Sequence, residues 1–174
     1  SRILEVQARS GFVPHVFLAL AHRPDEWRAF FAYHDALMLK TGGHLTKGDR
    51  EMIVVATSAA NDCLYCVVAH GAILRIYEKK PLVADQVATN WRKADITPRQ
   101  RAMLDFALKV CLRSGEIGEA DYAALREHGL DDEDAWDIIA ITAFFGMSNR
   151  MANGIGMLPN DEFYLMGRVP KTKG

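Results

Sequence analysis

The stretch NDCLYCVVAH, residues 61–70, holds the side chains of this sequence with the greatest capacity for chemistry. Cys63 and Cys66 are three positions apart, and His70 follows Cys66 by four. Residues three or four apart lie on one face of an α-helix, so on a helix each of these side chains would face the next. Two thiols and an imidazole in this order could form a redox-active thiol pair or part of a metal site.

Glu51 extends this group if the chain folds back on itself near Asn61. Glu51 precedes Asn61 by ten residues, and His70 follows Asn61 by nine. In an antiparallel helical hairpin both would lie about 15 Å from the turn, at a rise of ~1.5 Å per residue, on adjacent helices. The sequence therefore predicts the spatial order Cys63, Cys66, His70 and Glu51, which is suited to moving a proton to or from a thiol.

Each residue type in this group has a chemical reason. A thiol attacks peroxides and disulfides as the thiolate, whereas an unperturbed cysteine has a pKa of about 8.5. His70 could accept the Cys66 proton directly or through a water molecule, and the Glu51 carboxylate would stabilise the charged imidazole. Because peroxide reduction also needs a proton on the leaving oxygen, the cysteine next to a base, Cys66, is the predicted nucleophile. Cys63, at the helix N-terminus, would then close a disulfide with the oxidised sulfur.

Two other interpretations of these residues stay open. Zinc could be bound by Cys63, Cys66, His70 and a carboxylate, although structural zinc sites usually take their ligands from separate loops. Free cysteines are also commonly buried for packing alone. For Cys111, which lies on one face with Leu104 and other apolar residues, core packing is the expectation.

Several polar residues elsewhere carry weaker signals. His34 could reach a pocket, but an exposed or hydrogen-bonded histidine is the simpler interpretation. Asn149, Arg150 and Asn153 follow an apolar helix. For these three residues, a role at the helix C-terminus or at an interface is favoured over one in lining the pocket.

The elements that must position the site are predicted to be helices, because apolar residues recur at spacings of three and four with little alternation. Thr46, followed three residues later by Asp49, is typical of a helix N-terminus with a capping box. A helix from there to Asn61 and a second helix after it form the expected hairpin over residues 46–79. Further helices are predicted over residues 23–40, 82–93, 97–114, 119–128 and 131–151, with an irregular tail over 154–174.

Length and composition predict one all-α domain over residues 1–174. A chain of 174 residues buries roughly 70% of its unfolded surface, so it needs no disulfide or metal to fold. The 21 basic and 22 acidic residues form no basic stripe, which argues against nucleic acid as a partner. No apolar run approaches the ~20 residues of a membrane span. Three cysteines and no export signal favour a reducing cytoplasm.

Two of the predicted helices are apolar on more than one side. They contain MIVVATSAA, residues 52–60, and DIIAITAFFG, residues 137–146. A helix without a polar stripe must be buried. A small domain can bury one such helix at its centre, whereas two suggest that a neighbouring subunit covers part of the surface. The sequence therefore predicts a homo-oligomer.

The spacing Glu-x11-Cys-x2-Cys-x3-His is similar to the signature of the alkylhydroperoxidase AhpD and carboxymuconolactone decarboxylase-like superfamily. The segments HRPDEWRAFFAYHDALM, DREMIVVATSAANDCLYCVVAHGAILR and NRMANGIG resemble its peroxidase-related branch. The resemblance implies an AhpD-like helical bundle, assembly as a dimer, trimer or hexamer, and reduction of hydroperoxides without a cofactor. It also implies that Cys66 attacks, that Cys63 resolves, and that His70 and Glu51 relay the proton.

One position differs from AhpD itself. AhpD carries a second histidine between its cysteines, and this chain has Tyr65 there, whose phenol can donate a hydrogen bond but is a poor base near neutral pH. We expect a thiol peroxidase that reduces H2O2 or a small organic hydroperoxide, with an unidentified thiol as reductant. The same resemblance leaves a carboxymuconolactone decarboxylase-like enzyme without peroxidase activity as an alternative.

Overall fold

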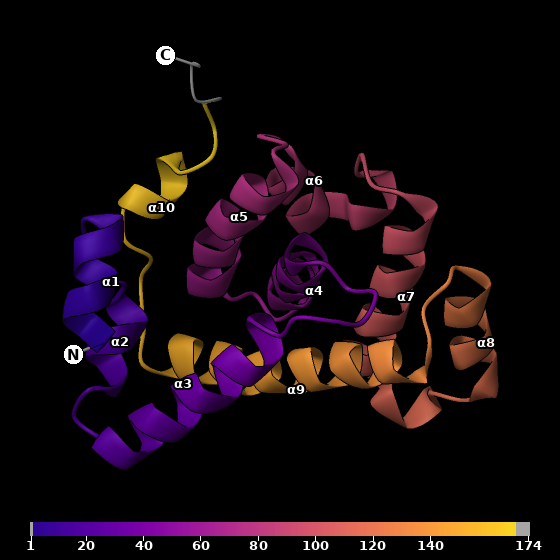
Figure 1. Ribbon diagram of the computed structural model, residues 1–174, viewed down its shortest axis with the longest axis horizontal. Coiled ribbons are helices and arrows are strands. Elements are labelled where there is room, and N and C mark those ends of the chain that lie inside the picture. Colours follow the sequence, from indigo (N-terminus) through magenta and orange to yellow (C-terminus); the bar gives the residue numbers. More distant parts are fainter. Residues whose placement is uncertain (1, 170–174) are drawn as a thin grey trace.

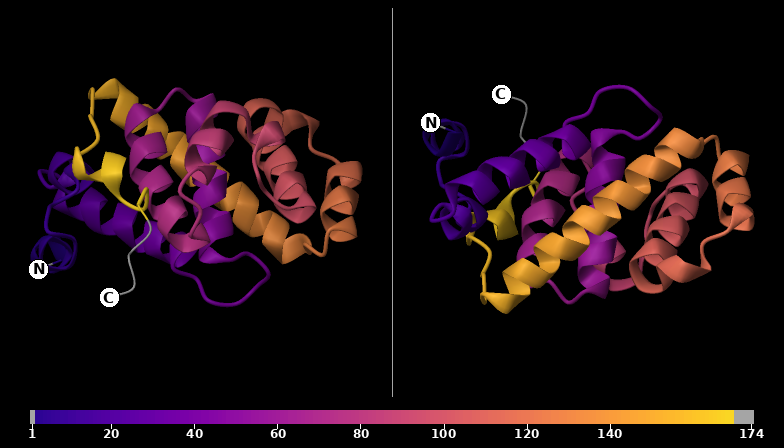
Figure 2. Two further views of the ribbon diagram at one scale, coloured as in Figure 1. Left: turned by 90° about the horizontal axis from the view of Figure 1, so that it is seen from above. Right: turned by 90° about the horizontal axis from the view of Figure 1, so that it is seen from below.

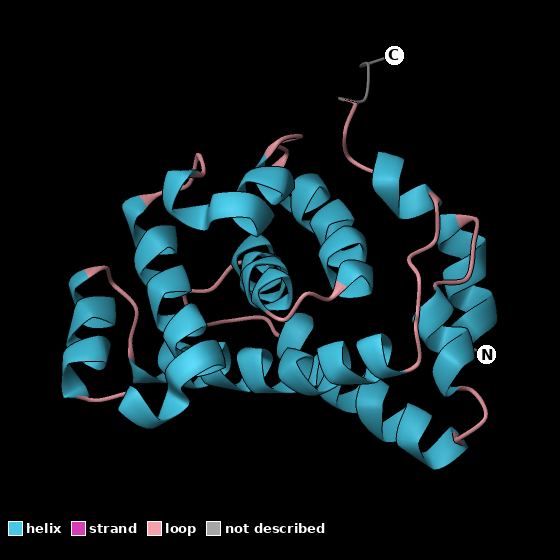
Figure 3. Cartoon of the chain, turned by 180° about the vertical axis from the view of Figure 1, so that it is seen from behind, coloured by secondary structure: helices cyan, strands magenta, loops and turns pink. Residues whose placement is uncertain are grey.

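The computed structural model describes residues 2–169 of the chain, and this part consists of helices and loops without a strand (Figure 3). The all-α prediction is confirmed. The α-helices are α1 (Arg2–Ser10), α2 (His15–Leu20), α3 (Pro24–Met38), α4 (Lys47–Ala60), α5 (Leu64–Glu78), α6 (Val83–Asn90), α7 (Pro98–Arg113), α8 (Glu119–Glu127), α9 (Asp132–Gly154) and α10 (Glu162–Leu165).

The α4–α5 hairpin has the form that the sequence predicts. Thr46 caps α4 reciprocally with Asp49: the Thr46 hydroxyl accepts from the Asp49 N–H at 3.0 Å, and the Asp49 carboxylate accepts from the Thr46 N–H at 2.9 Å. After α4 ends at Ala60, Asp62 adopts a left-handed conformation with a φ of 53°. The chain reverses there, and Cys63 is the N-cap of α5.

Helix α4 is enclosed by other helices of the same chain. Figure 1 shows it end-on at the centre, with α5, α6, α7 and α9 around it. Every residue from Gly48 to Ser58 is buried, including the charged Arg50. A buried charge needs polar partners, and the Arg50 guanidinium donates to Asp137 of α9 at 2.8 Å and to the Leu37 carbonyl at 2.9 Å. The apolar pattern of α4 is therefore satisfied within one chain.

Helix α9 runs across the underside of the bundle, beside α3 and in contact with α4 and α7 (Figure 2). Its N-terminus is capped by reciprocal hydrogen bonds between Asp131 and Asp134, each 2.9 Å long. The face towards α4 is buried, whereas Trp136, Met147 and Met151 on the outer face are exposed. One chain thus buries α4 completely but α9 on only one face.

The two terminal segments lie alongside α5 (Figure 1), where α10 packs on this helix and Val16 of α2 contacts Tyr65. Asn160 joins them, because its side chain accepts from the His15 N–H at 2.9 Å and donates to the Val13 carbonyl at 3.0 Å. Helices α1 and α2 were not predicted from the sequence. The tail predicted as irregular contains the short α10, and its residues 170–174 lie outside the described part. In the part that is described, no helix is both long enough and apolar enough to cross a bilayer.

Candidate active site

Glu51 and His70 meet across the hairpin, as the sequence predicts. Nδ1 of His70 lies 2.6 Å from Oε2 of Glu51, and both side chains are buried. An ionised carboxylate only accepts hydrogen bonds, so the proton of this bond is on Nδ1. Nε2 of His70 has no hydrogen-bond partner within residues 2–169, which leaves it available to exchange a proton with a ligand.

Cys63 and Cys66 are both buried, and both are free thiols. A hydrogen bond from the Cys66 thiol, helped by the Cys66 N–H and the Asn149 amide, lowers the pKa of Cys63 to about 6 against the opposing effect of burial. The same hydrogen bond to Cys63, together with burial, raises the pKa of Cys66. Near neutral pH the pair therefore holds one negative charge, centred on Cys63.

The predicted contact between Cys66 and His70 is not formed. Among the described residues no hydrogen bond joins His70 to either sulfur, and the Cys66 thiol interacts with the Cys63 sulfur instead. His70 acts on Cys63 through its charge alone. The four-residue spacing of Cys66 and His70 indicates a shared helix face, but it does not determine whether the two side chains touch.

A small, mostly apolar cavity of about 140 Å³ lies against α5. Cys66, His70 and His34 line it, whereas Cys63 does not. A ligand in this cavity would meet the sulfur of Cys66, which agrees with its predicted role as nucleophile; the catalytic roles themselves stay predictions. The rest of the wall consists of Arg2, Pro14, Val16, Phe17, Phe30, Phe31, Tyr65, Ala69, Ile73, Phe145, Ser148 and Phe163.

Asn149 lies directly behind the cysteine pair, and the prediction for this residue is wrong. It is fully buried, accepts from the Asn61 side chain at 3.0 Å, and donates to Ser58 at 2.9 Å as well as to both sulfurs. Helix α9 turns this side chain towards the α4–α5 turn rather than to a helix end or an interface. Its spacing of four residues from the buried Phe145 was the signal in the sequence.

Arg150 and Asn153, the neighbours of Asn149, are exposed on the end of α9. Arg150 donates to the Gly146 carbonyl at 2.7 Å, and Asn153 donates to the Asn61 carbonyl at 3.1 Å. Both residues therefore lie near the helix C-terminus, as predicted, and neither lines the cavity.

Tyr65 is buried between the two cysteines and connects α5 to α2. Its hydroxyl accepts from the Val16 N–H at 3.2 Å, and burial raises its pKa, so it remains a neutral phenol. Cys111 is half-buried rather than in the core, with its thiol directed to the Asn61 side chain at 3.8 Å. It lies outside the thiol pair and outside the cavity.

The geometry does not support the zinc interpretation. Within the described chain, only His44, Asp131 and Asp134 bring metal-type ligand atoms within 4.8 Å of one another; Cys63, Cys66 and His70 do not. The His44 group is already engaged in structure: Asp131 and Asp134 cap α9, and His44 bonds Asp134 at 2.6 Å.

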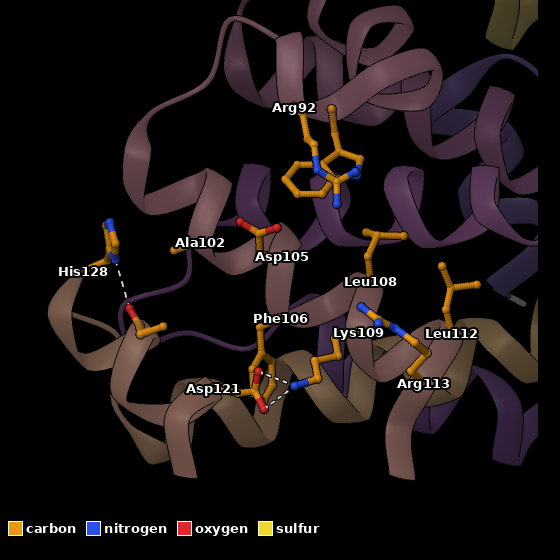
Figure 4. A pocket seen from close by; sticks show the side chains of 12 residues that line it. Arg92, Ala102, Asp105, Phe106, Leu108, Lys109, Leu112, Arg113, Asp121 and His128 are labelled. Atoms are coloured by element: carbon orange, nitrogen blue, oxygen red, sulfur yellow. Dashed lines mark hydrogen bonds and ion pairs between the residues drawn. The ribbon is translucent and has the colours of Figure 1, made fainter. Parts of the chain in front are cut away.

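A larger cleft of about 430 Å³ lies elsewhere, between α7, α8 and the 3-10 turn Trp91–Lys93 (Figure 4). Its charged side chains mostly have partners in the chain. Lys109 donates to both oxygens of Asp121 at 2.8 Å, and the Arg92 guanidinium lies 4.3 Å from the Trp91 ring. The cleft contains no thiol, so the cavity at Cys66 is the candidate active site.

Comparisons with known proteins agree on the family of this chain. The model of the Carboxymuconolactone decarboxylase family matches residues 24–81, which run from α3 through the hairpin. An uncharacterized peroxidase-related protein from Ralstonia eutropha, described as an alkylhydroperoxidase AhpD core, is 83% identical, with 98% of this chain and 89% of that chain covered and a TM-score of 0.96. An uncharacterized peroxidase-related protein from a Silicibacter species is 42% identical, with coverage of 96% and 87% and a TM-score of 0.92.

A more distant likeness concerns the fold alone. A debrominase crystallised with 2,3,4-tribromopyrrole is 20% identical, with 92% of this chain and 84% of that chain covered and a TM-score of 0.73. A search of curated proteins found no match.

Proposed function

Starting from the fact that this chain belongs to the AhpD-like carboxymuconolactone decarboxylase superfamily, we propose that it is a thiol peroxidase that reduces H2O2 or small organic hydroperoxides. The observation that carries the proposal is the shared cavity of Cys66 and His70. Glu51 lies behind the imidazole at 2.6 Å, and a second thiol lies behind the reactive sulfur.

The first half-reaction oxidises Cys66. Its thiol passes a proton to the Cys63 thiolate, and the new Cys66 thiolate attacks the terminal oxygen of the hydroperoxide. The S–O bond forms as the O–O bond breaks, so sulfur loses two electrons and the peroxide gains them. His70 gives a proton to the departing oxygen, which leaves as an alcohol or as water, and Glu51 stabilises the charged imidazole before that transfer.

The second half-reaction closes and reopens a disulfide. The Cys63 sulfur attacks the sulfenic acid of Cys66, a disulfide forms, and one water molecule is released. Two equivalents of an external thiol then reduce the disulfide and become oxidised themselves. A cytoplasmic location is part of the same proposal, because a reducing compartment supplies such thiols.

The character of the cavity favours this chemistry over decarboxylation. Its wall is mainly aromatic and aliphatic, which suits the organic part of a hydroperoxide. Its polar side chains are the Cys66 thiol, two imidazoles, and those of Arg2, Tyr65 and Ser148, of which Arg2 is already paired with Asp35. A decarboxylase-like enzyme without thiol chemistry would keep its turnover after Cys66→Ser, whereas a peroxidase of the proposed type would lose it.

The proposal includes a homo-oligomer that covers the outer face of α9. Trp136 is 69% exposed and Met147 is 45% exposed on this helix, and Tyr33 of α3 is exposed beside it. A groove lined by Tyr33, Met147 and Met151 continues the apolar surface. Contiguous apolar surface of this kind is typical of a protein–protein interface.

Mass spectrometry of trapped thiols tests the proposed cycle. After tert-butyl hydroperoxide is added, we expect a disulfide between Cys63 and Cys66 in the wild type and a sulfenic acid on Cys66 in Cys63→Ser. Cys111→Ser is the matched control, because Cys111 lies outside the cavity, and it should retain full turnover. A sulfenic acid on Cys63 in Cys66→Ser, with none on Cys66 in Cys63→Ser, would reverse the roles; no thiol oxidation at all would refute the function.

A further inference from the structure

His34 of α3 shares the cavity with Cys66 and His70, although the proposed cycle does not use it. Its ring centroid lies 6.4 Å from that of His70. The rings of Phe144 and Phe145 of α9 each lie 6.2 Å from it, so the imidazole is held in an aromatic wall. The His34 side chain is 22% exposed, so a ring nitrogen without a partner in the chain can bond a water molecule or a ligand in the cavity.

Only one nitrogen of His34 has a hydrogen-bond partner among residues 2–169. Nδ1 bonds the Asp35 carboxylate at 3.0 Å, and Arg2 donates to both oxygens of the same carboxylate at 2.6 and 2.8 Å. Because the Asp35 carboxylate can only accept hydrogen bonds, the proton of this bond is on Nδ1 of His34. Nε2 has no hydrogen bond within the described chain. His70 is similar, because its Nδ1 bonds the Glu51 carboxylate and its Nε2 has no hydrogen bond in the described chain. Two imidazoles that each bond a carboxylate through Nδ1 therefore line one cavity.

The protonation state of His34 makes its free nitrogen an acceptor. Burial lowers the pKa of His34, and this effect outweighs the opposing influence of Asp35 and Glu51. Arg2 neutralises Asp35 from the other side, and His70 adds to the lowering through its charge. A neutral imidazole with its proton on Nδ1 offers a lone pair at Nε2.

We propose that His34 is a substrate-binding residue of the peroxidase site, whose Nε2 accepts the hydrogen bond of the terminal O–H of the hydroperoxide. This inference rests on the proposed function. The bond holds the terminal oxygen, which the Cys66 sulfur attacks, while the second oxygen lies towards His70 and receives its proton. One hydrogen bond of about 2.8 Å to each oxygen, together with the O–O bond between them, spans up to roughly 7 Å between the two nitrogens. Ring centroids 6.4 Å apart are compatible with one peroxide group between the two imidazoles.

Comparison of two reactions of the same sulfur tests the inference. In a Cys63→Ser background, which retains the sulfenic acid, the rate of Cys66 oxidation by tert-butyl hydroperoxide is measured beside the rate of Cys66 alkylation by iodoacetamide. Iodoacetamide has no peroxide hydroxyl to hold. We expect His34→Phe to lower the oxidation rate about 10-fold, the value of one hydrogen bond, and to change alkylation less than about 3-fold. His34→Gln keeps an acceptor and should recover most of the oxidation rate.

His128→Phe is the control, since His128 is an exposed histidine on the distant α8 end, and it should leave both rates unchanged. Equal losses in oxidation and alkylation after His34→Phe would mean that the residue only supports the site, and an unchanged oxidation rate would mean that it does not bind the hydroperoxide. Either result overturns the inference while the peroxidase function stands. If neither the wild type nor the Cys63→Ser parent shows thiol oxidation, the proposed function falls, and the inference falls with it.

Discussion

At the cysteine pair, one thiol carries the charge and the other lines the cavity. The pKa of Cys63 is lowered to about 6, yet Cys63 is not part of the cavity wall; Cys66 lines the cavity, and its pKa is raised. In the proposed cycle, the Cys66 sulfur is therefore protonated at rest and becomes a thiolate by proton transfer to Cys63. The Asn149 amide donates to both sulfurs, so it can stabilise the charge before and after that transfer.

The charge of the pair predicts a pH dependence. Because the pKa of Cys63 is lowered to about 6, the thiolate is present above pH 6 and is lost as the pH falls through that value. We expect the ultraviolet absorbance of the thiolate, and the first-turnover rate with tert-butyl hydroperoxide, to rise together with a midpoint near pH 6. Cys63→Ser should move the absorbance midpoint to ~8.5 or above. A midpoint that stays near 6 in Cys63→Ser would mean that Cys66 carries the resting charge.

Glu51→Gln tests the carboxylate behind His70. The amide keeps the shape of the side chain but cannot stabilise a charged imidazole, so proton delivery to the leaving oxygen should slow. We expect kcat/KM for tert-butyl hydroperoxide to fall about 10- to 100-fold. With peroxyacetic acid, whose carboxylate leaves without a proton, the loss should be much smaller.

Glu127→Gln, at an exposed position on α8, is the control and should change neither value. An equal loss with tert-butyl hydroperoxide and peroxyacetic acid after Glu51→Gln would contradict a role for Glu51 in proton delivery.

At the scale of elements, the beginning of α4 determines where Glu51 lies. Thr46 and Asp49 cap this helix reciprocally, and Asp49 is further held by Arg99 at 2.9 Å and Gln100 at 3.1 Å, both from α7. Helix α5 begins at Cys63 after the turn at Asp62. The register of the two helices, and with it the Glu51–His70 contact, depends on these two boundaries.

Thr46→Ala tests the contribution of this cap. The substitution leaves the Asp49 N–H without its acceptor, and the free energy of unfolding should fall by about 1 kcal/mol in urea denaturation. Thr89→Ala, at an exposed position of α6, is the comparison and should stay within about 0.5 kcal/mol of the wild type. Equal stability of the two variants would show that Asp49 is held well enough by α7 alone.

At the scale of the whole molecule, one chain leaves an apolar surface over α3 and α9. The exposed residues of α9 recur at helical spacing, as expected for a helix that packs on both sides. The cavity at Cys66 shares only Phe30 with the groove on this face, and Pro14 and Phe163 of the terminal segments form part of its wall. A partner on the outer face of α9 would therefore leave the cavity wall intact.

Met147→Glu tests the proposed assembly. A carboxylate in the middle of the apolar face should dissociate the oligomer to monomers in sedimentation equilibrium, because an unpaired charge is costly to bury. Leu112→Glu is the matched control, since Leu112 is also exposed and apolar but lies on α7 away from this face, and it should leave the mass unchanged. A wild-type protein that is monomeric at micromolar concentration would refute the assembly.

The helical fold and the group of chemically active residues follow from local patterns in the sequence. Helical spacing, the capping signal at Thr46 and the turn near Asn61 are local properties, and the structure has each of them. The Glu51–His70 contact could also be predicted, because two helices joined by a tight turn must pair residues at equal distances from it. The short helices α1, α2 and α10 could not be predicted, because helices of one or two turns depend on packing for their stability.

Only the tertiary structure decided how the two sulfurs differ and which other residues join them. Asn149 and His34 are far from the cysteines in sequence, and α9 and α3 bring them to the pair and to the cavity. The spacing of two residues on one helix predicts that their side chains share a face, but not how far apart they are. It therefore indicated a contact between Cys66 and His70, whereas in the structure Cys66 contacts Cys63. The pKa of a thiol depends on burial and on donors from every neighbouring helix, and a single segment cannot specify those.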